Sequence, residues 1–115
     1  MSKTPDANER TRFARGSGNV FADLGLPDPE ELLAKARLAE AIDDAITRLG
    51  LTQVEAGRRM GVDQGTVSRL VNGRLDGFSQ ERLIRYLVTL GDSVQIVIGG
   101  GRKKGAGGRL TVTRV

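Results

Sequence analysis

The chain has 115 residues, which is enough for one domain with a modest core and for terminal segments outside it. It contains no Cys and no His, which excludes disulfides, thiol nucleophiles, the usual zinc sites and the commonest general base, so we expect neither an enzyme nor a bound cofactor or metal. The formal net charge of +4 and the isoelectric point near 10.1 suit a polyanionic partner.

Residues 1–19 are polar and have no periodic apolar face, so we expect a flexible N-terminal arm. Arg10, Arg12 and Arg15 around Phe13 leave open an arm that lies along phosphates or becomes ordered on a protein partner. The start of the chain has no apolar signal region, and no run approaches the roughly 20 apolar residues of a membrane span. We therefore expect a cytoplasmic protein without membrane contacts.

Residues 20–50 predict an apolar cluster followed by a long helix. The cluster before Pro27 is expected to pack against the domain and consists of Val20, Phe21, Leu24 and Leu26. Asp28 is the predicted N-cap and Pro29 the first helical residue. Six acidic and three basic residues in 28–50 predict an acidic, solvated outer face. We expect Asp43 and Asp44 to belong to this face rather than to a catalytic pair. The predicted buried stripe recurs every three or four residues up to Gly50 and comprises Leu32, Ala36, Ala39, Ile42, Ile46 and Leu49.

Residues 51–73 predict two short helices joined by a tight turn. Thr52 and Glu55 form a capping box at the start of the first helix, whose apolar side holds Ala56 and Met60. Gly61 ends it, because a residue without Cβ readily adopts the left-handed conformation of a helix C-terminus. The second helix is predicted to be capped by Asp63, to bury Val67, Leu70 and Val71, and to end at Asn72-Gly73.

The outward face of the second helix has the chemistry of a DNA-reading surface. In DNA-binding motifs made of two helices joined by a tight turn, the second helix places its N-terminal residues against the edges of the bases, while the first helix crosses the DNA backbone. Gln64 can pair bidentately with adenine, and Arg69 with guanine or a phosphate, so these are the predicted base readers. The remaining predicted contacts lie in the same motif and mainly position the DNA backbone: Gln53, Gly65, Thr66, Ser68, Asn72 and Arg74. An architectural helical hairpin with a solvated outer face is the alternative.

Residues 78–91 predict another helix that completes a small bundle. Phe78 and Leu83 flank the N-cap Ser79 as a hydrophobic staple. Gly91 closes the helix, and its predicted buried positions are Leu83, Ile84, Leu87, Val88 and Leu90.

The C-terminal residues 92–115 predict a small β-element. Val94–Ile98 is β-branched and Leu110–Val115 alternates with period two, so the two runs can pair in a hairpin or across a dimer. The segment between them, GGGRKKGAGG at 99–108, does not match a P-loop and is predicted to be a flexible loop. Its Arg102, Lys103 and Lys104 can add sequence-independent attraction to DNA.

The central motif resembles the lambda-repressor-like, or Xre/Cro, helix-turn-helix proteins. That resemblance implies a mainly α bundle of four to five helices that binds double-stranded operator DNA as a homodimer. Two positions depart from the family: Gly57 stands where Ala is usual, and Gly65 where many relatives carry a base-reading side chain. The matching residues are Leu51-Thr52-Gln53, Gly57, Gly61-Val62, Thr66-Val67-Ser68-Arg69-Leu70 and Asn72-Gly73.

A narrower resemblance starts at GNVFADLGLP, residues 18–27, ahead of the Pro-Glu-Glu helix start. Together with the helix-turn-helix and Val94–Ile98 it is similar to a subgroup of HigA-type antitoxins. This implies a repressor of its own operon that also neutralises a RelE/HigB-like toxin. A stand-alone Xre-family regulator and a protein-interaction adaptor without DNA binding are the alternatives. The expected organisation is an arm at 1–19, a DNA-binding domain at 20–91 and a β-strand with a glycine-rich basic tail at 92–115.

Overall fold

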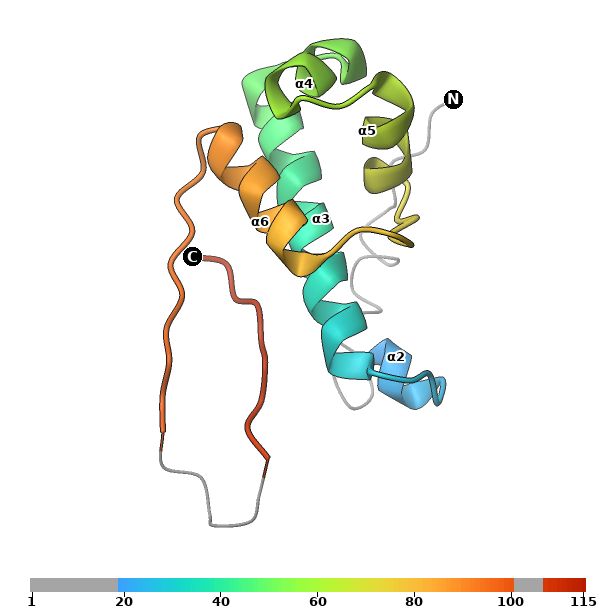
Figure 1. Cartoon of the computed structure of the whole chain (residues 1–115), viewed down its shortest axis with the longest axis vertical. Coiled ribbons are helices and arrows are strands. Elements are labelled where there is room, and N and C mark those ends of the chain that lie inside the picture. The colour runs from blue at the N-terminus through green and yellow to red at the C-terminus, as the bar shows by residue number, and fades with distance from the viewer. Residues whose placement is uncertain (1–18, 101–106) are drawn as a thin grey trace.

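The computed structural model describes residues 19–100 and 107–115, and this part of the chain contains five helices (Figure 1). The long α3 runs through the centre, α5 and α6 pack against it, and α4 contacts α5 and α6. The predicted helical bundle is therefore confirmed. The predicted arm up to residue 18 and the basic residues Arg102, Lys103 and Lys104 lie outside the described residues. The helices are α2 (Val20–Asp23), α3 (Pro29–Leu49), α4 (Gln53–Met60), α5 (Gln64–Val71) and α6 (Gln80–Thr89).

The predicted C-terminal β-element is wrong. Residues 92–100 and 107–115 run as extended chain beside the helices, and neither segment contains a strand (Figure 1). A β-branched run becomes a strand only when it finds a partner. Here the backbone of residues 107–115 forms hydrogen bonds with side chains of α3 instead. Arg37 donates to the Val112 carbonyl oxygen at 3.0 Å, and the Leu110 N–H donates to Glu30 at 3.4 Å.

The buried face of α3 is rotated from the predicted stripe. Ala39, Ile42 and Ile46 are buried as predicted, but Leu49 is 39% exposed. Leu32 and Ala36 are only half-buried. The many alanines of this 21-residue helix make more than one face apolar, so periodicity alone cannot choose between them. The buried residues that the prediction missed are Ala34, Leu38, Ala41 and Ala45.

The core between α3, α5 and α6 is closed by the residues around the start of α6. Phe78 and Leu83 are both buried, as the predicted staple requires. Ser79 caps α6 by accepting the Arg82 N–H at 3.1 Å. Periodicity predicts a buried Val88, but its side chain is 55% exposed, and Tyr86 is buried instead. The largest fully buried side chains are Phe78, Ile42, Leu70, Leu83 and Val67.

The short α2 is tied to the start of α3. Asn19 caps α2, and its Nδ2 donates to the Pro29 carbonyl oxygen at 2.9 Å. Asp28 is the N-cap residue of α3 and Pro29 its first residue, as predicted, but the φ of Asp28 is +50° and its side chain makes no capping hydrogen bond. An N-cap side chain usually reaches the helix from extended backbone, which Asp28 does not adopt. Leu24 and Leu26 are 68% and 41% exposed, so the predicted packing of the cluster holds only in part.

Gly57 sets how closely α4 approaches the turn before α5. A Cβ on this residue would lie 2.6 Å from the backbone oxygen of Val62, whose N–H donates to the Gly57 carbonyl at 2.9 Å. A Cβ on Gly65 would meet only the Asp63 carboxylate, at 3.6 Å. The two glycines thus have opposite tolerance for a methyl group.

We expect Gly57→Ala to lower the free energy of unfolding by about 1–3 kcal/mol, because the backbone of the turn must shift to make room. Gly65→Ala is the matched control. It should leave stability unchanged or raise it by up to about 1 kcal/mol, because alanine favours the helix. Urea unfolding of both variants measures the difference, and equal stabilities would show that the turn is not held by the close approach at Gly57.

Candidate nucleic-acid interface

The limits of α4 and α5 are set by the capping residues that the sequence predicts. The Thr52 N–H donates to Glu55 Oε1 at 2.8 Å, and the Glu55 N–H donates to Thr52 Oγ1 at 3.1 Å, which completes the capping box. Gly61 ends α4 with a φ of +77°. Asp63 then caps α5, because its Oδ1 accepts both the N–H and the hydroxyl of Thr66 at 2.8 Å.

These hydrogen bonds also change the acidity of the two capping carboxylates. The Thr52 backbone N–H is the main cause that lowers the pKa of Glu55 from its ordinary value of 4.5. The Thr66 hydroxyl, followed by its N–H, lowers the pKa of Asp63 from its ordinary value of 3.8. Both side chains are therefore negatively charged caps at neutral pH.

Acid should weaken the fold through these caps. A carboxyl whose pKa is lower in the folded state stabilises the protein above its unfolded pKa, and this contribution is lost as pH falls through the folded pKa. The urea midpoint should therefore stay level above about pH 5 and fall below about pH 4. In Glu55→Gln/Asp63→Asn both caps keep an acceptor but no longer titrate, so the decline should become shallower. An identical acid profile would show that other groups control it.

A glutamine pair joins the first residues of α4 and α5. Gln64 Nε2 donates to Gln53 Oε1 at 2.5 Å, although the two residues lie 11 positions apart in the sequence. Gln64 is exposed and Gln53 half-buried. The sequence predicted both as DNA contacts but not that they touch. The hydrogen bond fixes the Gln64 amide at the N-terminal end of α5, which is the end that meets base edges in this motif.

Arg69 is held against the loop that follows α5. Its Nη2 donates to the Asp76 carbonyl oxygen at 2.9 Å, and its guanidinium carbon lies 4.9 Å from the centre of the Phe78 ring. The Arg82 guanidinium lies 5.0 Å from the same ring. The sequence assigned base reading to Arg69 and gave no role to Arg82. The contact between Arg69 and Phe78 is non-local and has no sequence signal.

The other predicted site residues lie along α5 and in the loop that follows it. Asn72 Nδ2 donates to the Ser68 carbonyl oxygen at 2.8 Å and so closes the last turn of α5. Arg74 is exposed, and its N–H donates to the Arg69 carbonyl oxygen at 2.9 Å. Gly65 is exposed and leaves the first turn of α5 without a side chain. The sequence reasoning also missed Arg58 and Arg59, which add exposed positive charge on α4.

Comparison with known proteins gives the same architecture. A family model described as a helix-turn-helix domain matches residues 20–99. A solved structure described as a putative XRE family transcriptional regulator superimposes with a TM-score of 0.69 at 42% sequence identity, covering 77% of this chain and 100% of that one. The chain belongs to the XRE family of helix-turn-helix transcriptional regulators.

XRE membership identifies α4 and α5 as the helix-turn-helix and double-stranded DNA as the ligand class that the family implies. No curated protein is significantly similar to the sequence. In residues 19–100 and 107–115, no helix is both long enough and apolar enough to cross a membrane.

Proposed function

We propose that this XRE-family protein is a sequence-specific repressor that reads its operator through the N-terminal end of α5. The hydrogen bond between Gln53 and Gln64 carries this proposal. The side-chain amide of glutamine has two N–H groups, and its carbonyl oxygen can accept hydrogen bonds as well. Gln64 can therefore bond to Gln53 and still present one N–H and its oxygen to adenine N7 and N6. Gln53 keeps its own amide N–H groups for a phosphate.

Arg69, Asn72 and Arg74 support the same reading from the other end of α5. A guanidinium has five N–H donors, so the bond of Arg69 to the Asp76 carbonyl leaves others for DNA. Its stacking on Phe78 also orders the loop that carries Arg74. We assign these three residues mainly to the phosphate backbone, with base reading by Arg69 as an additional role.

Selection from a pool of random duplexes tests sequence-specific reading. Bound sequences should converge on two inverted half-sites about one helical turn apart, each with an adenine that the Gln64→Ala variant no longer selects. Binding without enrichment of particular sequences would show that the protein binds DNA non-specifically. Absence of binding would favour a protein-interaction adaptor without DNA contacts.

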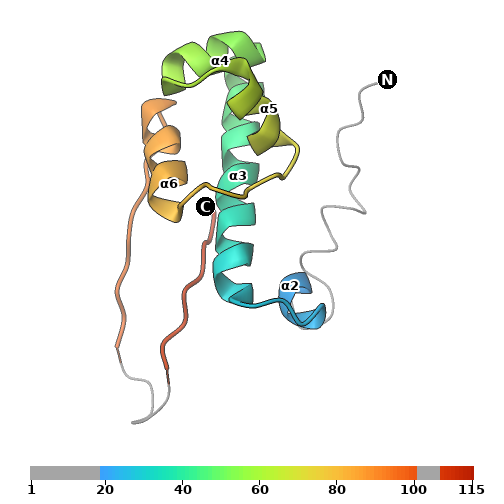
Figure 2. The same cartoon turned by 45° about the vertical axis from the view of Figure 1, so that its right-hand side comes forward.

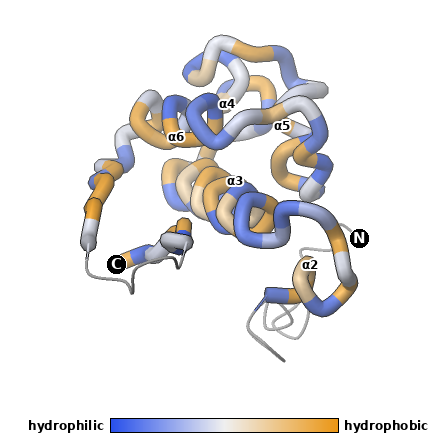
Figure 3. The backbone as a smooth tube through the Cα atoms, turned by 60° about the horizontal axis from the view of Figure 1, so that its bottom comes forward, coloured by the Kyte–Doolittle hydropathy of each residue, from blue (hydrophilic) through white to orange (hydrophobic). Residues whose placement is uncertain are grey.

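A homodimer is the assembly that two half-sites require. The run after α6 offers an apolar contact, because Ile96, Val97 and Ile98 are 74%, 79% and 92% exposed (Figure 3). Exposed apolar clusters of this kind mark interaction surfaces. We expect Ile96→Lys/Ile98→Lys to shift the chain from dimer to monomer in sedimentation equilibrium. Gln95→Lys, a charge control in the same segment, should remain dimeric. A wild-type chain that is monomeric would show that this apolar run is not a dimer interface.

We further propose that the protein is the antitoxin of its operon and neutralises a RelE/HigB-like toxin. The resemblance of residues 18–27 supports this role, and the acidic outer face of α3 offers a surface for a positively charged partner. Co-expression with the product of the neighbouring small gene tests it. Growth arrest by that product alone, relieved in a complex with this chain, is the expected result. No arrest and no complex would leave a stand-alone XRE regulator.

A further inference from the structure

The last residues of the chain lie along one side of α3. Figure 2 shows the C-terminal segment running beside α3. Arg114 pairs with Asp44 at 2.5 Å and with Glu40 at 3.8 Å, and Arg109 lies 3.8 Å from Glu30. We call Glu30, Glu40 and Asp44 the acidic flank of α3, and residues 109–115 the tail. The tail therefore meets the acidic flank at both of its ends.

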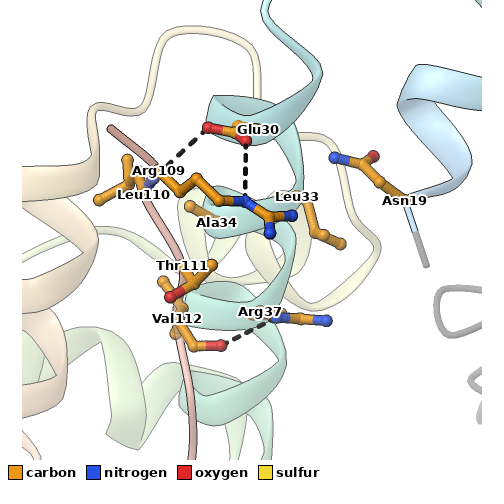
Figure 4. Close-up of a pocket in the computed structure, with 9 residues that line it drawn as sticks. All are labelled: Asn19, Glu30, Leu33, Ala34, Arg37, Arg109, Leu110, Thr111 and Val112. Carbon is orange, nitrogen blue, oxygen red and sulfur yellow. Dashed lines mark hydrogen bonds and ion pairs between the residues drawn. The ribbon is translucent and has the colours of Figure 1, made fainter. Parts of the chain in front are cut away.

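Glu30 of the acidic flank and Arg37 on the same helix also bind the backbone of the tail. Glu30 accepts the Leu110 N–H, and Arg37 donates to the Val112 carbonyl oxygen at 3.0 Å (Figure 4). Such contacts do not depend on the side chains of the bound segment. They bind an extended backbone, with charge at its two ends supplying the selectivity.

The spacing of the charges requires an extended segment. Glu30 and Asp44 are separated by about 21 Å along α3, given a rise of about 1.5 Å per residue. An extended chain covers about 17 Å between Arg109 and Arg114, at about 3.3 Å per residue, whereas a helix would cover only about 7.5 Å. The flank thus fits an extended peptide with two basic residues about five positions apart.

The tail is held loosely. Within the described residues, 107–115 makes no backbone–backbone hydrogen bond, and the side chains of Arg109 and Arg114 are 65% and 43% exposed. Exposed ion pairs contribute little to stability. Val112 alone in this segment is half-buried and packs against the core, and a cavity of about 250 Å³ remains between the tail and α3. A tail bound in this way can be displaced.

We propose that the acidic flank of α3 is a docking surface for an extended, arginine-bearing segment of the toxin, and that the tail occupies this surface until the toxin displaces it. The inference rests on the proposed antitoxin function. Charge complementarity supports a basic partner, and the tail shows the geometry that the partner segment would adopt. The tail then acts as a built-in competitor that lowers the apparent affinity for the toxin.

A fluorescein-labelled peptide with the sequence of residues 107–115, GGRLTVTRV, is the first probe. Arg114→Glu in the full chain should weaken the docking of its own tail and raise peptide affinity about tenfold over the wild type. Glu40→Gln/Asp44→Asn should weaken peptide binding about tenfold relative to Arg114→Glu, because it removes both carboxylates that pair with Arg114. Arg85→Glu is the matched control, because it reverses an exposed arginine that pairs with Glu81 at 3.2 Å on α6, and it should bind peptide as the wild type does. Circular dichroism checks that all variants are folded.

The toxin is the second probe, added to the complex of labelled peptide and the Arg114→Glu variant. Release of the peptide is the expected result, together with weaker toxin binding by Glu40→Gln/Asp44→Asn. Equal peptide affinity in the wild type and Arg114→Glu, or a folded Glu40→Gln/Asp44→Asn that binds peptide as tightly as Arg114→Glu does, would overturn the displaceable tail. A toxin that binds without releasing peptide would overturn the docking surface while leaving the antitoxin function intact. A neighbour product that never binds would instead refute the antitoxin function itself.

Discussion

Replacing Phe78 with alanine is expected to lower the free energy of unfolding by about 3–5 kcal/mol, the largest stability effect in this domain. The side chain is 2% exposed and sits in the core cluster with Leu70 and Leu83. Its ring also lies within 5.0 Å of the guanidinium carbons of both Arg69 and Arg82. Alanine would leave a cavity and would remove the support of both guanidinium groups.

Val88→Ala is the matched control for Phe78→Ala. Sequence periodicity places Val88 in the core, but the side chain is 55% exposed, so its loss should change stability by less than about 1 kcal/mol. Urea unfolding of both variants separates the two. A loss at Val88 as large as that at Phe78 would mean that the exposed face of α6 is buried in solution, for example in a dimer.

Replacing Gln64 with alanine is expected to weaken binding to the selected operator by about 1–3 kcal/mol, because a bidentate contact with adenine is lost. Binding to unrelated duplexes should hardly change, since that binding comes from phosphate contacts. Gln95→Ala is the control, because Gln95 is an exposed glutamine in the segment after α6. Competition titrations of fluorescent operator at one fixed salt concentration give both affinities.

Gln53→Ala completes a double-mutant cycle with Gln64→Ala. Because the two amides share a hydrogen bond of 2.5 Å, their effects on operator affinity should not add. If the two losses add within about 0.5 kcal/mol, Gln53 does not orient Gln64, and the two side chains contribute to operator binding independently.

The parts of the fold that sequence predicts well are those determined locally. Thr52 with Glu55, Gly61 and Asp63 act within a few residues of their own position, and each was found in its predicted role. Asp28 occupies its predicted N-cap position, but its backbone is left-handed and its side chain makes no capping hydrogen bond. Local capping chemistry therefore predicts where α4 and α5 begin and where α4 ends.

The parts that sequence missed depend on contacts between distant residues. The face of α3 was misassigned because alanines make several faces apolar, and only packing selects one of them. The pattern of Val94–Ile98 predicts a strand paired with residues 110–115. The backbone of that second segment instead bonds to Glu30 and Arg37 of α3. In the site, Gln53 and Gln64 were predicted as separate contacts, and no pattern indicates that Arg69 stacks on Phe78.

The central claim is that the N-terminal end of α5 reads DNA sequence. Its most direct test compares the affinity of the wild-type chain for the selected operator and for a scrambled duplex of the same composition at physiological salt. We predict a ratio of at least about 10³ in favour of the operator. Equal affinities for the two duplexes would contradict sequence-specific reading and leave only electrostatic binding to the DNA backbone.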